Sequence, residues 1–136
     1  MSEKEPELNA TGTATLVVGP QDLASSISNE IEDEFPPVLA TARMIALMEI
    51  AAARVLQPLL EPGELSVGVI VNVTHLAPTP LGAKVTATAR YTRREGKLFH
   101  FEVSVADSGG EVGRGSHKRA IVSSEQLQSA ATKRVG

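Results

Sequence analysis

The chain has 136 residues, a formal net charge of −3 and 42% hydrophobic residues, which suits one globular domain with its own core. Aromatic residues make up only 3% and no basic run interleaves with them, which disfavours nucleic-acid binding. Cysteine is absent, which excludes disulfides, thiol catalysis and cysteine-ligated metal and favours a cytoplasmic protein.

The two ends of the chain differ in composition from its middle. The first residues are acidic and polar, without the basic and apolar regions of a signal peptide, and we expect them to be flexible. No apolar run approaches the roughly 20 residues that a membrane span needs. We therefore divide the chain into a flexible segment at 1–12, a domain at 13–123 and a polar tail at 124–136.

A first strand is expected over Thr13–Val18, before Gly19 and Pro20. Residues 19–37 then form a long polar connection that ends in Phe35-Pro36-Pro37. A loop of this length inside a compact domain is typical of a lid or a binding loop.

The segment Pro37–Leu60 is the only long stretch with helical character. Prolines suit its start, and Pro58 suits its end. Its apolar residues recur at three- and four-residue spacing, which predicts one buried face. These residues are Met44, Leu47, Met48, Ala51 and Val55.

Four strands are expected after the helix, because apolar and polar residues alternate in each. They are Ser66–Leu76, Lys84–Arg94, Leu98–Ala106 and Glu111–Val122. Their short links predict a meander of antiparallel strands. With one long helix against one face of the sheet, the chain is expected to be an α+β fold, and its apolar strands make a homodimer plausible.

Glu49 is unusual in this helix. The residues three and four positions away, Ile45, Ala46, Ala52 and Ala53, cannot pair with a carboxylate. We place Glu49 on the buried side, where it either reaches a lysine or arginine of the sheet or takes part in chemistry.

Thr41 and His75 complete a candidate set with Glu49. Eight residues along a helix separate Thr41 from Glu49 by about 12 Å, so the two cannot touch but can flank one substrate. Taken singly, Thr41 is more often a helix cap and His75 a hydrogen-bonded core residue. Together, a hydroxyl, a carboxylate and an imidazole are the groups needed for acyl transfer or hydrolysis.

Weaker signals lie in the strands. Gly68 indicates either a bulge or a close backbone approach to a ligand, and a free N–H there would stabilise an oxyanion. Arg119 suits a carboxylate or phosphate, although a solvated arginine is commoner. His100 and His117 show no metal-ligand spacing with His75. Gly113 and Gly115 lie within a strand pattern and do not form a phosphate loop.

Two segments together resemble a known family. FPPVLATARMIALMEIAAARVLQPLLEPGE, followed by VNVTHLAPTPLG, resembles the hotdog-fold thioesterases of the fluoroacetyl-CoA thioesterase type, over about Phe35 to Ile121. The resemblance implies a curled antiparallel sheet around one long helix, and a homodimer with two active sites at its interface.

The resemblance also assigns roles. It implies that Thr41, Glu49 and His75 are catalytic, that Gly68 lies near the thioester carbonyl and that Arg119 lies in the pocket. Phe35 matches an aromatic gate beside the lid. In the fluoroacetate-specific enzyme a second aromatic precedes that gate by three residues, whereas this chain has Glu32 there.

We therefore expect an acyl-CoA thioesterase that hydrolyses a small acyl-CoA, with no metal or cofactor and no nucleic-acid or membrane partner. Two alternatives stay open. One is another hotdog enzyme such as a hydratase, although the expected Asp/His dyad is not seen. The other is a non-catalytic acyl-ligand binding protein on the same scaffold.

Overall fold

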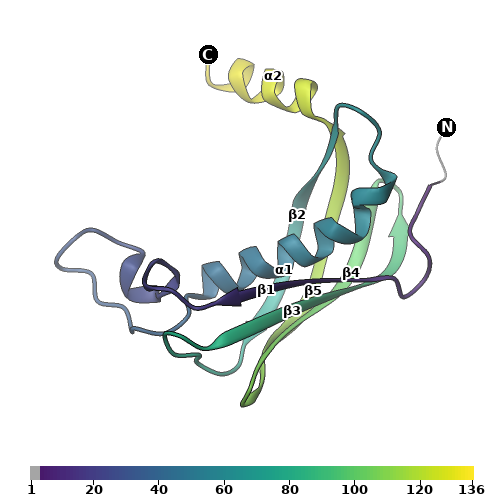
Figure 1. Ribbon diagram of the computed structural model, residues 1–136. Coiled ribbons are helices and arrows are strands. Elements are labelled where there is room, and N and C mark those ends of the chain that lie inside the picture. Colours follow the sequence, from purple (N-terminus) through teal and green to yellow (C-terminus); the bar gives the residue numbers. More distant parts are fainter. Residues whose placement is uncertain (1–3) are drawn as a thin grey trace.

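The computed structural model describes residues 4–136 and shows a five-stranded antiparallel sheet that curls around one helix (Figure 1). This confirms the expected α+β arrangement. The elements in chain order are β1 (Thr11–Val17), α1 (Thr41–Leu56), β2 (Glu64–His75), β3 (Lys84–Glu95), β4 (Leu98–Asp107), β5 (Gly110–Ser123) and α2 (Ser124–Val135). Short 3₁₀ turns lie at Pro20–Asp22, Ala24–Ser26 and Gln57–Leu59. No helix among the described residues is long and apolar enough to cross a membrane.

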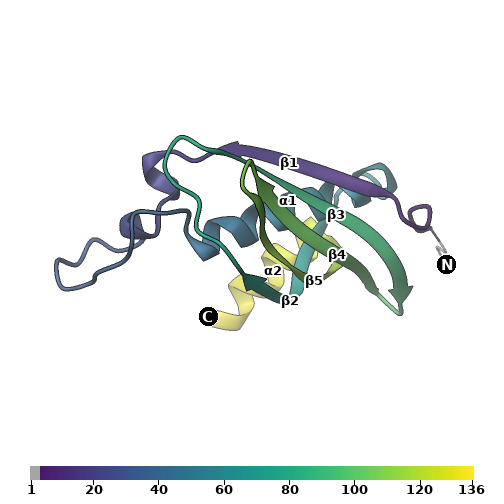
Figure 2. The same cartoon turned by 90° about the horizontal axis from the view of Figure 1, so that it is seen from below.

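The strand order is β1-β3-β4-β5-β2, so the expected meander is right for β3, β4 and β5 but wrong for β2. After His75 the chain stays beside β5, because the backbone N–H groups of Leu76 and Ala77 donate to the Val112 carbonyl. It then passes the start of α1, where Leu39 N donates to Thr79 O at 2.9 Å, and reaches the part of the sheet that is far from β2 in the strand order. The link of residues 76–83 therefore places β2 at one edge and β3 next to β1 (Figure 2).

Helix α1 begins four residues later than its expected start at Pro37. Val38 and Leu39 are extended instead and form isolated bridges with Pro80 and Leu23. Ala40 is the N-cap residue, with extended backbone angles and no side-chain cap. The approach to the helix is therefore clamped between the lid and the link of residues 76–83, which fixes where the first helical residue lies.

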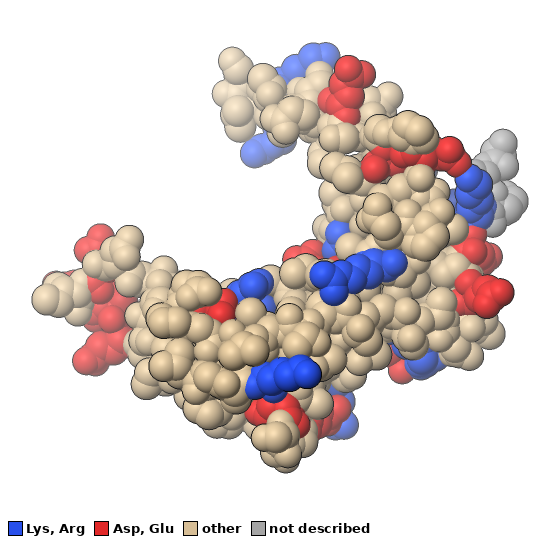
Figure 3. All heavy atoms as spheres, viewed as in Figure 1, with Lys and Arg blue, Asp and Glu red and all other residues tan. Residues whose placement is uncertain are grey.

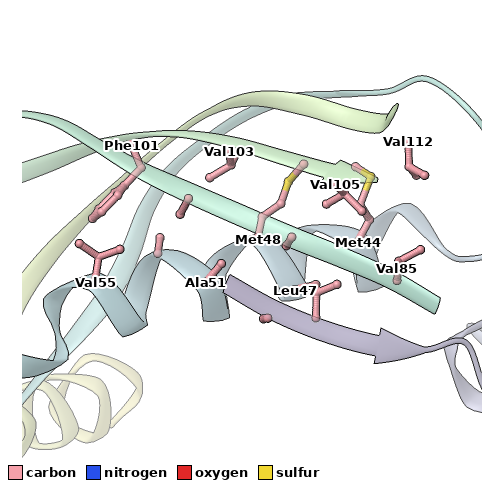
Figure 4. Packing of buried hydrophobic residues seen from close by; sticks show 14 of the residues in the cluster. Met44, Leu47, Met48, Ala51, Val55, Val85, Phe101, Val103, Val105 and Val112 are labelled. Carbon is pink, nitrogen blue, oxygen red and sulfur yellow. The ribbon is translucent and has the colours of Figure 1, made fainter. Parts of the chain in front are cut away.

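The core lies between α1 and the concave face of the sheet (Figure 4). All five apolar helix residues expected to be buried are buried, from Met44 at 0% to Val55 at 8% exposure. Burying a side chain of this size contributes about 1.5–3 kcal/mol. They face apolar residues of β3, β4 and β5, among them Val85, Phe101, Val103, Val105 and Val112.

Glycine lets β1 lie directly against the helix. A Cβ at Gly12 would lie 2.3 Å from the Ala51 carbonyl oxygen. A side chain there would push the strand from α1, so the helix position is set by backbone contact as well as by side-chain packing.

The two ends of the chain lie outside the core formed by α1 and the sheet. Residues 1–3 are outside the described part, and the flexibility expected of 1–12 stays a prediction. Within the segment, Asn9 N donates to Tyr91 O, and Tyr91 Oη donates to Glu5. The polar tail forms α2, which has no buried residue and stands away from the sheet (Figure 1).

Candidate active site

Thr41 and His75 are in direct contact. Thr41 is the first residue of α1 and His75 is the last of β2, and Thr41 Oγ1 lies 2.8 Å from His75 Nδ1. Because Ala40 is the N-cap and has no side-chain cap, the Thr41 hydroxyl is not the cap of this helix. The structure thus replaces the capping interpretation with a hydroxyl–imidazole pair.

The free end of the imidazole has no protein partner in the described chain. His75 Nε2 is buried and makes no hydrogen bond there. When Thr41 donates to Nδ1, the neutral ring carries its proton on Nε2. A hydroxyl bonded to an imidazole is the arrangement in which a base activates a nucleophile or a water molecule.

The pair lies in a pocket of about 530 Å³. The remaining lining is almost entirely apolar and comes from the lid, the start of α1 and the link after β2. The lining residues are Ala24, Ile27, Phe35, Pro36, Val38, Leu39, Thr41, Ala42, His75, Leu76, Ala77 and Pro78. Phe35, expected as a gate, is thus in the same pocket as Thr41 and His75, with 47% of its surface exposed.

The lid is tied to the body by Asp22, which the sequence analysis did not single out. Asp22 is 2% exposed and accepts hydrogen bonds from Gly19 N at 2.8 Å and Arg43 Nε at 2.9 Å. The signal for it was local, since an acidic residue shortly after Gly-Pro commonly pairs with a backbone N–H in a turn. Arg43 lies two residues after Thr41, so the pair connects the lid base to the catalytic end of α1.

The outer part of the lid is acidic. Glu30, Glu32, Asp33 and Glu34 surround its tip, where Asp and Glu gather in Figure 3, and Ile31 is 97% exposed. At its stem, Ser25 N donates to Pro36 O at 3.0 Å. The lid is therefore a closed loop with a fixed stem beside Phe35.

Glu49 belongs to a second cluster. Its Oε2 accepts a hydrogen bond from Arg119 Nη1 at 3.2 Å. The alternative in which Glu49 reaches an arginine of the sheet is therefore confirmed. The expected burial of Glu49 is wrong: its side chain is 39% exposed, whereas that of Arg119 is 7% exposed. The residues three and four positions away along the helix are apolar, which suggested burial, but Glu49 lies at the edge of the buried face of α1.

Gly68 allows this carboxylate to approach β2. A Cβ at Gly68 would lie 2.2 Å from Glu49 Oε2. The pairing of β2 with β5 shifts between Gly68 and Ile70, so Val69 has no partner in the register. The bulge expected at Gly68 is confirmed, and the group that approaches the glycine is the Glu49 carboxylate. The approach to a ligand stays a prediction. The bulge also breaks the valine alternation, and His75 shares a face with Val71 and Val73 but not with Val67.

Arg119 is held by the sheet. Its Nε donates to Ser66 Oγ at 3.0 Å and its Nη2 to Ser66 O at 2.9 Å. Burial lowers the pKa of Arg119, while the Glu49 carboxylate raises it. The guanidinium therefore lies beneath Glu49 and fixes it from the side of β2 and β5.

His117, set aside in the sequence analysis, joins this cluster. It is 1% exposed, its Nδ1 lies 2.8 Å from Ile70 O, and its Nε2 lies 3.1 Å from Arg119 Nη1. Burial and the nearby guanidinium lower its pKa, so the ring stays neutral. Its one sequence signal was the alternation that places it on the same face of β5 as Arg119. No group of three or more His, Cys, Asp and Glu in residues 4–136 is arranged to hold a metal ion.

The candidate residues thus form two groups within one chain. Thr41, His75 and Phe35 meet at the start of α1, while Glu49, Gly68 and Arg119 meet at its middle. The helical rise separates the two groups by about 12 Å along the axis.

Comparisons with known proteins agree on one family. Residues 18–125 match the family model described as fluoroacetyl-CoA-specific thioesterase. The fluoroacetyl-CoA thioesterase of Streptantibioticus cattleyicolor is 46% identical over 94 residues, which cover 69% of this chain and 68% of that protein.

Solved structures give the same result. The chain resembles the fluoroacetyl-CoA thioesterase FlK with a TM-score of 0.88 and 37% identity, over 96% of this chain and 98% of that one. A Thermus thermophilus member of the thioesterase superfamily has a TM-score of 0.84 and 26% identity, over 97% and 94%. A hot-dog-like protein from Thermanaerovibrio acidaminovorans has a TM-score of 0.81 and 28% identity, over 96% and 93%. The chain therefore belongs to the fluoroacetyl-CoA-specific thioesterase family, among the hotdog-fold thioesterases.

Proposed function

We propose that the protein hydrolyses a small acyl-CoA thioester to the free acid and coenzyme A. The observation that carries this proposal is the 2.8 Å contact between Thr41 and His75 inside the lid pocket. Family membership supports it, as do the ligands of FlK, variants of which were solved with acetyl-CoA, with fluoroacetate, and with fluoroacetate and CoA.

In this mechanism the Thr41 hydroxyl either attacks the thioester carbonyl or holds the water that attacks it. His75 takes the proton of the attacking group as general base. The tetrahedral intermediate then expels the thiolate, and the imidazolium returns the proton to sulfur. When water is the attacking group, this step also yields the free acid. When Thr41 is the attacking group, it leaves an acyl ester on Thr41, and a water molecule that His75 deprotonates then hydrolyses this ester to the free acid and restores the Thr41 hydroxyl. A general base typically contributes about 10²–10⁴-fold in rate, which suffices for a bond with a good leaving group.

We infer that a second copy of the chain brings Glu49 to this pair. Strand β2 is an edge strand, and it exposes Leu65 (50%), Val69 (51%), Ile70 (41%) and Val71 (41%). The other edge strand, β1, is shorter and exposes Thr11, Thr13 and Thr15 with a single large apolar residue, Val17 at 61%. An exposed apolar edge strand pairs readily with another strand, which favours β2 as the dimer contact.

A two-fold axis at Asn72 satisfies both groups. In an antiparallel pair of β2 strands, residues at equal distances from the axis lie opposite each other. Because Val69 is the extra residue of the bulge, Asn72 is midway between Gly68 and His75 in the pairing, and this axis places Gly68, with Glu49 above it, opposite the partner's His75. Two identical sites result, each with Thr41 and His75 from one protomer and Glu49, Gly68 and Arg119 from the other. Glu49 then orients or polarises the pair, and the backbone at Gly68 receives the negative charge that develops on the carbonyl oxygen.

Subunit mixing tests the shared site. A hybrid dimer of one Glu49→Ala chain and one His75→Ala chain contains one intact site only when the two residues come from different protomers. We expect the mixture to regain up to about half of the activity per hybrid dimer, as the number of intact sites dictates. No recovery, with hybrid dimers present by mass spectrometry, would contradict the shared site.

The lid pocket, which Phe35 and Leu39 help to line, holds about 530 Å³. The acyl group is small in this proposal because the relatives act on fluoroacetyl-CoA or were solved with acetyl-CoA and fluoroacetate. Glu32 stands where the fluoroacetate-specific relative has a second aromatic, so the lid of this chain is more polar. A panel of acyl-CoAs of graded length, with fluoroacetyl-CoA included, read by thiol release, identifies the substrate.

Two variants test the chemistry. Loss of turnover in His75→Ala and Glu49→Ala is expected, whereas unchanged turnover in both would overturn the assignment. Binding of acyl-CoA without thiol release would indicate the binding-protein alternative, and a hydrated product without thiol release would indicate a hydratase. The expected cytoplasmic location stays a prediction, which cell fractionation tests.

A further inference from the structure

We propose that His117 is a positioning residue that sets the place of the Glu49 carboxylate through Arg119. The inference rests on the proposed function, because it assumes that Glu49 serves the thioesterase reaction. The observations behind it are one buried imidazole, one buried guanidinium and the acceptors that surround both.

The acceptors around Arg119 divide its donors into two sets. Ser66 occupies Nε and Nη2, through its hydroxyl and its carbonyl oxygen. The two hydrogens of Nη1 remain, together with the second hydrogen of Nη2, and two acceptors face Nη1: Glu49 Oε2 at 3.2 Å and His117 Nε2 at 3.1 Å. His117 therefore fixes the same nitrogen that holds Glu49. Without this acceptor, Nη1 is restrained by Glu49 alone, a partly exposed side chain on another element.

The tautomer of His117 follows from its other contact. The Ile70 carbonyl oxygen is only an acceptor, so the Nδ1 that faces it at 2.8 Å carries the proton. A neutral imidazole with the proton on Nδ1 has its lone pair on Nε2, and it accepts from Arg119. The Ile70 carbonyl thus determines that His117 is an acceptor toward Arg119.

The contacts of His117 and Arg119 also involve the bulge of β2. Ile70 immediately follows the bulged Val69, and Gly68 precedes it. A Cβ at Gly68 would lie 3.2 Å from His117 Cε1 as well as 2.2 Å from Glu49 Oε2. The Gly68 backbone, which is to receive the carbonyl oxygen, therefore lies against both the His117 imidazole and the Glu49 carboxylate. Each of these three groups restricts where the other two can lie.

A purely structural role for His117 makes a different prediction. The ring also packs on Phe101, with 6.5 Å between ring centroids. If His117 only filled the core and supported the bulge, activity in its variants would follow stability. If it positions Arg119, activity follows the acceptor at Nε2.

Two substitutions separate these roles. In His117→Gln the side-chain amide reaches the place of Nε2 and accepts from Arg119, but the bond to Ile70 is lost. In His117→Asn the amide reaches the place of Nδ1 and donates to Ile70, but it does not reach Arg119. His100→Asn, at a buried histidine on the opposite face of the sheet, controls for the loss of an imidazole.

The whole chain, in the assembly that it forms in solution, is assayed by thiol release with the best substrate of the acyl-CoA panel. We expect His117→Gln to stay within about threefold of the wild-type kcat. We expect His117→Asn to lose about 10²-fold in kcat with little change in KM, because a misplaced catalytic group affects the chemical step. His100→Asn is expected to stay near wild type. Equal kcat in His117→Asn and His117→Gln, or losses that follow the unfolding midpoints, would overturn the proposal.

A readout independent of turnover distinguishes this failure from failure of the proposed function. Nitrogen-15 NMR of the wild type is expected to show His117 protonated on Nδ1 alone, and a slowly exchanging Arg119 Nη1 group. That Arg119 signal is expected to persist in His117→Gln and to be lost in His117→Asn. Persistence in both variants would refute the positioning role whether or not the protein releases thiol.

Discussion

Replacing Gly68 with alanine is the most direct perturbation of the Glu49 site. The added Cβ would lie 2.2 Å from Glu49 Oε2 and 3.3 Å from Glu49 Cδ. Non-bonded heavy atoms pack at roughly 3.5 Å, so the carboxylate has to move by about 1 Å. The obstructing atom is the end of a flexible side chain, and the carboxylate therefore moves while the strand stays in place.

The magnitudes differ between activity and stability. A displacement of about 1 Å at a catalytic group costs about 10²-fold in rate. An off-rotamer side chain costs about 0.5–1.5 kcal/mol, so the free energy of unfolding is expected to fall by about 1 kcal/mol. Thiol release measures the first effect, and urea denaturation measures the second.

A double-mutant cycle gives the decisive comparison. With Glu49 already replaced by alanine, the one close neighbour left to the new Cβ in these contacts is His117 Cε1 at 3.2 Å, which needs to shift by only a few tenths of an ångström. Gly68→Ala is therefore expected to cost little further activity in that background. Wild-type turnover in Gly68→Ala, or the same fold loss of activity with and without Glu49, would contradict displacement of the Glu49 carboxylate as the cause.

Three further predictions concern the dimer, the lid and pH. Val71→Lys is expected to give monomers in sedimentation velocity, because a charge replaces an apolar side chain at the β2 edge. Activity is expected to be lost together with the dimer, and an active monomer would contradict the shared site. Asp22→Ala is expected to raise KM and to lower stability by about 1–3 kcal/mol, because the Gly19 N–H and the Arg43 guanidinium lose their buried acceptor. Arg43→Ala is expected to show a stability loss of similar size, because it leaves the buried Asp22 carboxylate without its charged partner. An unchanged KM in Asp22→Ala would separate the lid base from substrate binding. Folding lowers the pKa values of His100 and His117, so below about pH 6.5 the unfolded chain binds more protons than the folded chain. The free energy of unfolding therefore falls as the pH decreases below about 6.5. Unfolding midpoints at pH 5.5 and 7.5 test this, and the difference between them should shrink in His117→Gln.

The local part of the fold was predictable from the sequence. Three- and four-residue spacing identified the buried face of α1, and alternation identified each strand, because both patterns arise from neighbouring residues. Strand order was not predictable in the same way. The position of β2 depends on contacts of Leu76 with Val112 and of Leu39 with Thr79, which join segments that are distant in sequence.

The candidate site shows the same division. Thr41 and His75 were paired from residue type and family resemblance, and their hydrogen bond replaced the capping interpretation. The exposure of Glu49 was misjudged because helix neighbours describe only one side of a residue. Asp22 was not assigned because its partner Arg43 lies 21 residues away, and His117 was not assigned because the carbonyl oxygen that its Nδ1 faces, that of Ile70, lies 47 residues away. Such pairs become visible only when the strands and the lid are in place.

Thiol release from a short acyl-CoA by the purified protein tests the central claim most directly. The account predicts one free coenzyme A thiol for each free acid formed, and loss of both products in His75→Ala. Saturable binding of acyl-CoA without any thiol release in the wild type would contradict it.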